Sequence, residues 1–96
     1  MIVALQREAR RDLEDATSWY ESKASGLGDE FLFEIEFAFE QIGEFPEASP
    51  IVYRGFRRHV LHRFPFCVFY TVAETQIDVV AVHHASRDPN AWKTRA

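Results

Sequence analysis

A chain of 96 residues has room for one hydrophobic core, so we expect a single domain that spans residues 1–96. Hydrophobic residues make up 47% of the sequence and aromatic residues 15%, a composition too apolar for a disordered segment. No apolar run approaches the roughly 20 residues of a membrane-spanning helix, and no secretory signal pattern is present. With Cys67 as the only cysteine, no internal disulfide can form. These features predict a cytoplasmic protein without membrane contact.

Charge is divided unevenly along the chain. Residues 1–48 hold four basic residues against twelve acidic ones, whereas residues 49–96 hold seven basic residues against three acidic ones. A negative first half and a positive second half present different surfaces to partners. We therefore expect different functional roles for the two halves.

The first half predicts a helical hairpin. After a short apolar start at residues 2–5, residues 6–23 carry apolar side chains at intervals of three and four positions, the pattern of an amphipathic helix. Residues 24–28 contain two glycines and predict a turn. A second helix is expected over residues 29–45, where Pro46 ends it.

The second helix has more aromatic residues than one buried face requires. Phe33, Phe37 and Phe39 lie outside the apolar stripe formed by Phe31 and Ile35. A helix apolar over so wide an arc is buried from two sides or keeps an exposed patch for a partner. Two interpretations stay open: extra core or homodimer contact, or a groove for another protein.

The second half predicts strands. Residues 57–63, 66–73 and 76–84 are rich in β-branched and aromatic side chains, and residues 51–54 form a possible short fourth strand. Because the connections are short and contain no helix, we expect an antiparallel meander with the helices on one face. Residues 76–84 are apolar on both faces, which predicts a central strand covered on both sides. The predicted fold class is α+β, an N-terminal helical hairpin packed on a sheet of three to five antiparallel strands.

Common catalytic and metal motifs are missing, including a phosphate-binding glycine loop, GxSxG, HExxH and paired CxxC. On regular strands His59 and His62 point to opposite faces, and so do His83 and His84. Neither pair can chelate a metal by itself. We expect no metal and no cofactor.

A basic cluster is the remaining chemical feature of the second half. On a strand Arg57 and Arg63 share one face while Arg58 takes the other, and His84 and Arg87 follow the last strand. These residues form either a solvated edge with surface ion pairs or a surface that contacts anions or nucleic acid. The pattern leaves both interpretations open.

Several short strings of residues carry a family resemblance. They are Arg57-Arg58, Arg63-Phe64-Pro65-Phe66, and His84 followed by Arg87-Asp88-Pro89 and Trp92, with Trp19-Tyr20-Glu21 and Gly26-Leu27-Gly28 in the first half. In their order and spacing they resemble the ParE branch of the RelE/ParE toxin superfamily, which belongs to type II toxin-antitoxin and plasmid stabilisation systems. The resemblance covers nearly the whole chain.

The resemblance implies a RelE/ParE-like fold and a partner. A toxin of this kind is neutralised by a cognate antitoxin, which for ParE-like members is a ribbon-helix-helix protein similar to ParD. An amphipathic antitoxin helix would fit the aromatic face of the second helix. The candidate antitoxin-binding residues are Phe33, Phe37 and Phe39.

The superfamily divides over mechanism. ParE-like toxins are linked to inhibition of DNA gyrase and do no chemistry, whereas RelE-like toxins cut messenger RNA on the ribosome. A ribosome-bound nuclease benefits from strong positive charge, yet this chain has a pI of about 5.5. RelE-like members also usually carry a basic residue at the position that Cys67 occupies here. We therefore expect a gyrase-binding toxin without direct nucleic-acid binding, whose candidate target-binding residues are Arg57, Arg58, Arg63, His84 and Arg87.

Two alternatives accompany this expectation. In a ribonuclease, Arg63, His84 and Arg87 would bind phosphate and supply a general acid, although no general base is evident. A degenerate family member would bind only its antitoxin. For the remaining residues we expect structural roles: Trp92 packs the C-terminal tail on the sheet, Asp88 and Pro89 shape the turn that aims Arg87, and Cys67 is a small buried hydrophobe.

Overall fold

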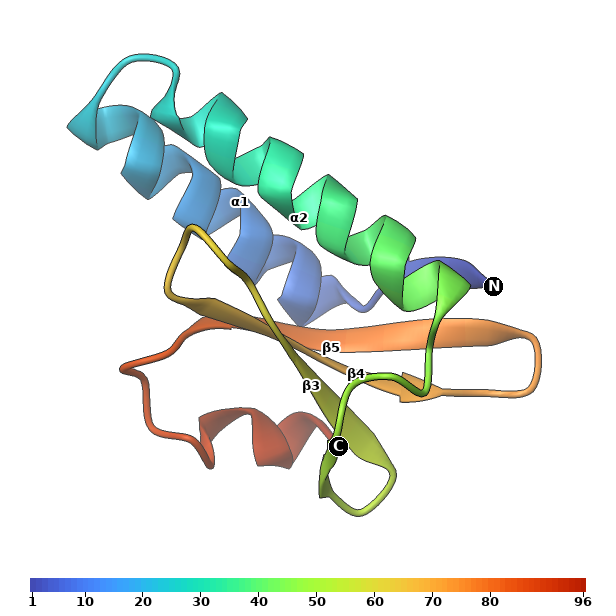
Figure 1. The fold of residues 1–96 in the computed structure, drawn as a ribbon. Helices are drawn as coiled ribbons and strands as arrows, with labels where there is room; N and C mark the ends of the chain where they lie inside the picture. The colour runs from blue at the N-terminus through green and yellow to red at the C-terminus, as the bar shows by residue number, and fades with distance from the viewer.

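The computed structural model describes residues 1–96 and contains two helices, five strands and a short C-terminal 3-10 helix (Figure 1). The α-helical hairpin and the following strands confirm the predicted α+β class. In chain order the elements are β1 Ile2–Leu5, α1 Arg7–Lys23, α2 Leu27–Glu44, β2 Ile51–Tyr53, β3 Phe56–Val60, β4 Phe66–Val72, β5 Gln76–His84 and η1 Ala91–Arg95.

The five strands form one mixed sheet in the order β1-β5-β4-β3-β2. Strands β2 to β5 are antiparallel neighbours, as predicted from their short connections. The expectation of a wholly antiparallel sheet is corrected at β1, which pairs parallel to β5. The short-connection argument does not apply to β1, because α1, α2 and three strands separate it from β5 along the chain.

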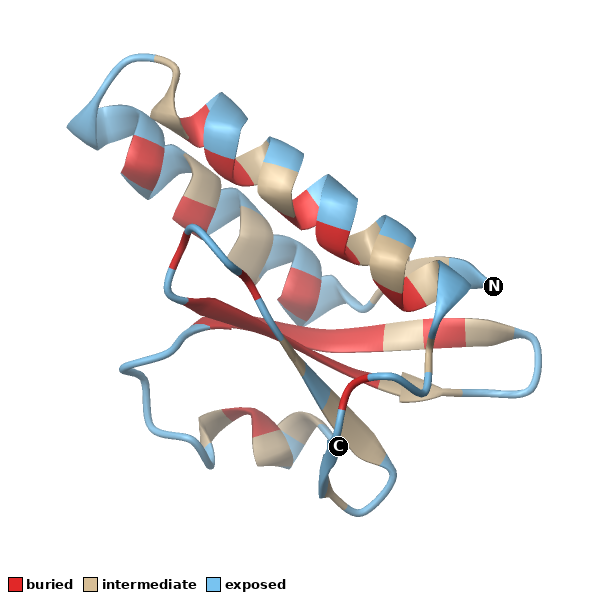
Figure 2. Ribbon diagram, viewed as in Figure 1, coloured by how far each residue is buried: buried red, intermediate tan, exposed pale blue.

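Both helices cover one face of this sheet (Figure 1). Buried residues lie on the sheet-facing sides of α1 and α2 and along β5 (Figure 2). Aromatic rings from the helices pack edge-on against rings of the sheet half. The ring centroids are 4.8 Å apart for Tyr20 and Phe64, 5.2 Å for Phe31 and Phe64, and 5.0 Å for Phe31 and Phe66. Such pairs add to the free energy gained from apolar burial.

The opposite face of the sheet is covered by η1. Trp92 stacks on Phe69 with ring centroids 4.5 Å apart and is 1% exposed. Cys67, Val80 and Ala81 complete this second cluster. Strand β5 is therefore covered on both faces and lies between two other strands, which confirms its predicted central position.

Strand β3 is shorter than predicted. The sequence predicts this strand over residues 57–63, but its pairing with β4 ends at Val60 and Cys67. The backbone N–H of Leu61 then donates to the carbonyl of Phe66 and closes a tight loop. The face assignments beyond Val60 were consequently wrong: Arg63 does not share a strand face with Arg57, and His62 lines the same small hollow as His59.

The turn between the helices is held by Glu21. Its two carboxylate oxygens accept hydrogen bonds from the backbone N–H groups of Gly26 and Gly28, each at 2.9 Å. Gly26 has a φ of 86°, a conformation that glycine adopts without strain. At Gly28 a Cβ atom would lie 2.8 Å from the carbonyl oxygen of Thr17, so the two helices approach too closely there for any side chain.

Replacing Gly28 with alanine is therefore expected to destabilise the fold by about 1–3 kcal/mol, the usual range for overpacking a tight contact. Denaturation in urea measures this difference as a lower midpoint. Gly55→Ala is the matched control, because a Cβ atom at Gly55 would meet nothing closer than the Thr71 hydroxyl at 3.8 Å. Equal midpoints for the two variants would contradict the close-packing explanation.

Candidate functional site

The loop at residues 85–90, which joins β5 to η1, separates two cavities. One cavity lies between this loop and α1 and has a volume of about 360 Å³; we call it the α1 cavity. The other lies between the loop, β3 and η1 and has a volume of about 50 Å³; we call it the η1 cavity. His83, His84 and Arg87 line both cavities.

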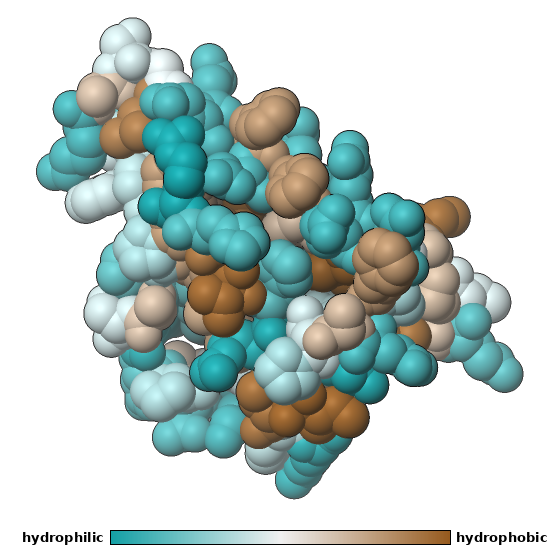
Figure 3. Space-filling view, viewed as in Figure 1, coloured by the Kyte–Doolittle hydropathy of each residue, from teal (hydrophilic) through white to brown (hydrophobic).

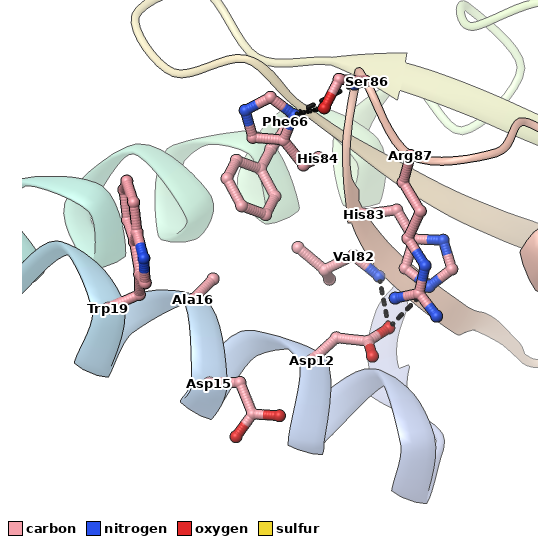
Figure 4. Close-up of a pocket in the computed structure, with 10 residues that line it drawn as sticks. All are labelled: Asp12, Asp15, Ala16, Trp19, Phe66, Val82, His83, His84, Ser86 and Arg87. Atoms are coloured by element: carbon pink, nitrogen blue, oxygen red, sulfur yellow. Dashed lines mark hydrogen bonds and ion pairs between the residues drawn. The ribbon is translucent and has the colours of Figure 1, made fainter.

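The α1 cavity has an apolar base and polar sides. Figure 4 shows Trp19 and Arg87 on opposite sides of it, with Ala16, Phe66 and Val82 between them. Its volume falls within the range of small-molecule sites, and its apolar base suits a side chain presented by a partner protein equally well.

The ring of His84 is fixed by its neighbour Ser86. The backbone N–H of Ser86 donates to Nδ1 of His84 at 3.0 Å, and the Ser86 hydroxyl lies 2.7 Å from the same nitrogen. Because a backbone N–H can only donate, Nδ1 is the acceptor and the proton of neutral His84 is on Nε2. His84 therefore offers one N–H donor to a bound group.

A largely buried charge network forms part of the wall of the α1 cavity. Oδ2 of Asp12 accepts hydrogen bonds from Nη1 of Arg95 at 2.6 Å and from the backbone N–H of Val82 at 3.0 Å. Nε2 of His83 lies 3.3 Å from the same oxygen, without the alignment of a hydrogen bond. Burial raises the pKa of Asp12, but His83, Arg95 and the Val82 N–H together outweigh it and lower the pKa from 3.8 to about 2. Asp12 is therefore ionised at neutral pH.

Sequence reasoning did not predict this network. Asp12 and Arg95 are 83 residues apart, and only the fold brings them together. One local signal was present: Asp12 lies three residues after Ala9 and four before Ala16, on the apolar stripe of its helix. An acid at such a position requires a buried partner.

The η1 cavity contains two arginines from separate elements. Arg58 comes from β3 and Arg87 from the loop, and neither guanidinium group has a hydrogen bond or an ion pair. Cys67 lines the same cavity and is buried, as predicted. Burial raises the pKa of the Cys67 thiol, and the nearby charge of Arg58 opposes this effect only in part.

The other two arginines proposed for target binding lie elsewhere. Arg57 points to the helix side and donates to the backbone carbonyls of Glu47 and Ser49 at 3.0 and 2.7 Å. Arg63 pairs with Glu30 at the start of α2 at 3.1 Å, and both side chains are exposed. The structure thus gathers Arg58, His84 and Arg87 around one loop and separates Arg57 and Arg63 from them.

Residues 88–92 give the loop its shape. Oδ1 of Asp88 accepts a hydrogen bond from the backbone N–H of Asn90 at 2.9 Å, and the Asp88 carbonyl accepts one from Ala91. Asp88, Pro89 and Trp92 all line the η1 cavity beside Arg87.

The aromatic residues of α2 fall into two groups. Phe33 is 72% exposed and Phe37 is 46% exposed, whereas Phe39 is half-buried against the core beneath the helices. Apolar side chains project at intervals along α2 among polar ones (Figure 3). The exposed aromatic residues of α2 are therefore Phe33 and Phe37.

No group of three or more His, Cys, Asp or Glu side chains is arranged to hold a metal ion. Neither α1 nor α2 is long and apolar enough to cross a membrane.

A family model described as the ParE toxin of the type II toxin-antitoxin system parDE matches residues 3–89. This chain belongs to the ParE toxin family. The matched range contains Asp12, Arg58, His84 and Arg87, and it ends before Trp92 and Arg95. The resemblance read from the sequence is thereby confirmed, and the chain is a ParE-family toxin of the type II toxin-antitoxin class.

Individual proteins agree with this assignment. The chain is 30% identical over 82 residues to Toxin ParE2 of Mycobacterium tuberculosis, in both strain CDC 1551 / Oshkosh and strain ATCC 25618 / H37Rv, covering 83% of this chain and 77% of each relative. A solved structure of the chromosomal ParDE system from P. aeruginosa has a TM-score of 0.68 at 21% identity, covering 88% of this chain and 95% of that one. At this identity the structural likeness supports the ParE-like fold.

Proposed function

We propose that this ParE-family toxin stops growth by binding DNA gyrase and that a cognate ribbon-helix-helix antitoxin similar to ParD neutralises it. The observation that carries the proposal is the grouping of Arg58, His84 and Arg87 at one loop, where both guanidinium groups are unpaired within the chain. Unpaired arginines on β3 and on the loop that follows β5 are suited to binding acidic groups of another protein.

The alternative ribonuclease receives less support from the geometry. Its phosphate-binding set would combine Arg63 with His84 and Arg87, but Arg63 lines neither cavity and pairs with Glu30 instead. At the position where RelE-like toxins carry a basic residue, Cys67 is buried. A net charge of −4 also gives little general attraction to RNA.

Purified gyrase tests the proposal directly. The toxin is expected to inhibit supercoiling and to stabilise cleaved DNA, and Arg87→Ala is expected to weaken inhibition about tenfold or more, since hydrogen bonds to charged groups contribute about 1.5–3 kcal/mol each. Arg63→Ala is the matched control and should inhibit like the unmodified toxin.

Other outcomes would select the alternatives. Toxicity in cells without any effect on gyrase, accompanied by cuts in ribosome-bound messages, would replace this proposal with the ribonuclease. Harmless expression of a well-folded chain would indicate a family member that binds only its antitoxin.

The same proposal places the antitoxin on α2. Phe33 and Phe37 are exposed there, and acidic side chains flank them at Glu30, Glu36 and Glu40. An amphipathic antitoxin segment with apolar anchors and a basic rim complements this surface.

A further inference from the structure

The η1 cavity has the size of a single small chemical group. Its volume of about 50 Å³ is well below the ~300 Å³ at which organic ligand sites begin, yet above the roughly 10–15 Å³ that one bound water needs. A carboxylate or a phosphate group is of this order of size. The cavity is therefore too small for a free metabolite and large enough for one polyatomic group.

The charge of the lining favours an anion. Arg58 and Arg87 reach this cavity from β3 and from the loop, and no carboxylate of the chain pairs with either. Asp88 is the only acid in the lining, and its Oδ1 is already occupied by the N–H of Asn90. Two unpaired guanidinium groups line this cavity, and both would attract an anion that enters it.

The cavity wall also contains polar hydrogen-bonding groups without partners. Trp92 is 1% exposed, and its indole N–H, which can only donate, has no hydrogen-bond partner. His83 is 3% exposed and its Nδ1 is likewise unpartnered. Buried polar groups are normally satisfied, and an acceptor bound in this cavity within reach of the Trp92 N–H would supply the partner that this donor lacks.

We infer that the η1 cavity is a binding site for one anionic group, a carboxylate or a phosphate, held by Arg58 and Arg87. A second hollow of about 160 Å³, lined by Lys93 and Asn90, shares Arg58 and Trp92 with it. A larger molecule that carries the anionic group therefore has a basic surface beside the cavity on which to extend.

The two tryptophans provide the test. In ¹H–¹⁵N spectra of the full chain, the indole N–H of Trp92 reports on the η1 cavity and that of Trp19 reports on the α1 cavity. Titration with inorganic phosphate and, separately, with acetate at constant ionic strength is expected to move the Trp92 indole signal saturably while the Trp19 signal stays in place. A Trp19→Phe variant assigns the two signals.

Variants identify the groups that bind. Arg58→Gln and Arg87→Gln are each expected to weaken binding about tenfold or more, as loss of a charge-assisted contact does. Arg63→Gln is the control and should leave the titration unchanged. Arg58 and Arg87 are both exposed, and the dispersion of the spectrum checks that each variant is folded.

The outcomes are distinct. Tighter binding of phosphate would indicate a phosphorylated or nucleotide source, and tighter binding of acetate would indicate an acidic side chain of a protein partner. The inference would be overturned by a shift that is linear in anion concentration, that chloride reproduces, or that appears only at Trp19. Unchanged affinity in both Arg58→Gln and Arg87→Gln would also overturn it. Because the isolated toxin is used, this result is independent of whether gyrase is the target.

Discussion

Replacing Arg95 with alanine is expected to lower the free energy of unfolding by about 3 kcal/mol, because it leaves a buried carboxylate without its main partner. The side chains of Arg95 and Asp12 are 15% and 10% exposed and are joined by two hydrogen bonds at 2.6 and 3.2 Å. Arg95 also donates to the carbonyl of Val80 at 3.0 Å, so its loss removes a hydrogen bond between η1 and β5 as well as the ion pair with α1. The expected value lies at the lower end of the range for broken buried pairs, because Asp12 keeps the Val82 N–H.

Urea denaturation at neutral pH measures this loss, with Arg11→Ala as the control. Arg11 is an exposed arginine of α1 without an ion pair, and its removal should change the free energy of unfolding by less than about 0.5 kcal/mol. A double-mutant cycle with Asp12→Asn separates the interaction of the pair from other effects of each substitution. A loss below about 1 kcal/mol in Arg95→Ala would show that the pair contributes no more than an exposed one.

The acid dependence of stability checks the same network. The pKa of Asp12 is lowered from 3.8 to about 2 in the folded chain, so folding favours the ionised form. Its contribution is fully present above pH 3.8, and it is lost as the pH falls through about 2. By linkage this contribution to the free energy of unfolding is about 2 kcal/mol. The stability advantage of the unmodified chain over Asp12→Asn should therefore shrink by about 2 kcal/mol as the pH falls from 3.8 to about 2.

The fold was predictable wherever one local pattern determined it. The apolar spacing of Ala9, Ala16 and Tyr20 predicts a helix on a single face, and the observed α1 has those residues buried. Short connections likewise predict antiparallel pairing of β3, β4 and β5. The parallel pairing of β1 required knowledge of where the chain returns after the helices, which no local pattern contains.

The site was predictable only in part for the same reason. His84 and Arg87 lie close together in sequence, and Arg58 reaches them because β3 pairs with β4 and β4 with β5. Arg63 was grouped with them on the assumption that β3 continues beyond Val60, and the tight loop at Leu61 removes it. The Asp12 to Arg95 pair joins the two ends of the chain and could not be read from spacing.

The double substitution Phe33→Asp and Phe37→Asp is expected to abolish co-purification with the antitoxin while the fold is retained. Both rings are exposed on α2, at 72% and 46%, so their removal costs the folded chain little. In a complex the two rings would become central apolar contacts, whose truncation typically costs about 2 kcal/mol or more each and weakens binding by several orders of magnitude together.

Phe45→Asp is the matched control, because Phe45 is also exposed, at 56%, but follows the end of α2 at Glu44. Co-purification should survive this substitution. Reversal of a flanking charge in Glu40→Lys is expected to slow association and to make it less sensitive to salt, because the proposed antitoxin segment has a basic rim. If the Phe33→Asp, Phe37→Asp variant retains the antitoxin and Glu40→Lys associates at the original rate, the antitoxin does not dock on α2. The remaining candidate surface is then the sheet side, around Arg58 of β3 and Arg87 of the loop that follows β5. Antitoxin and target would then compete for the same arginines, and neutralisation would be direct occlusion of the toxic surface.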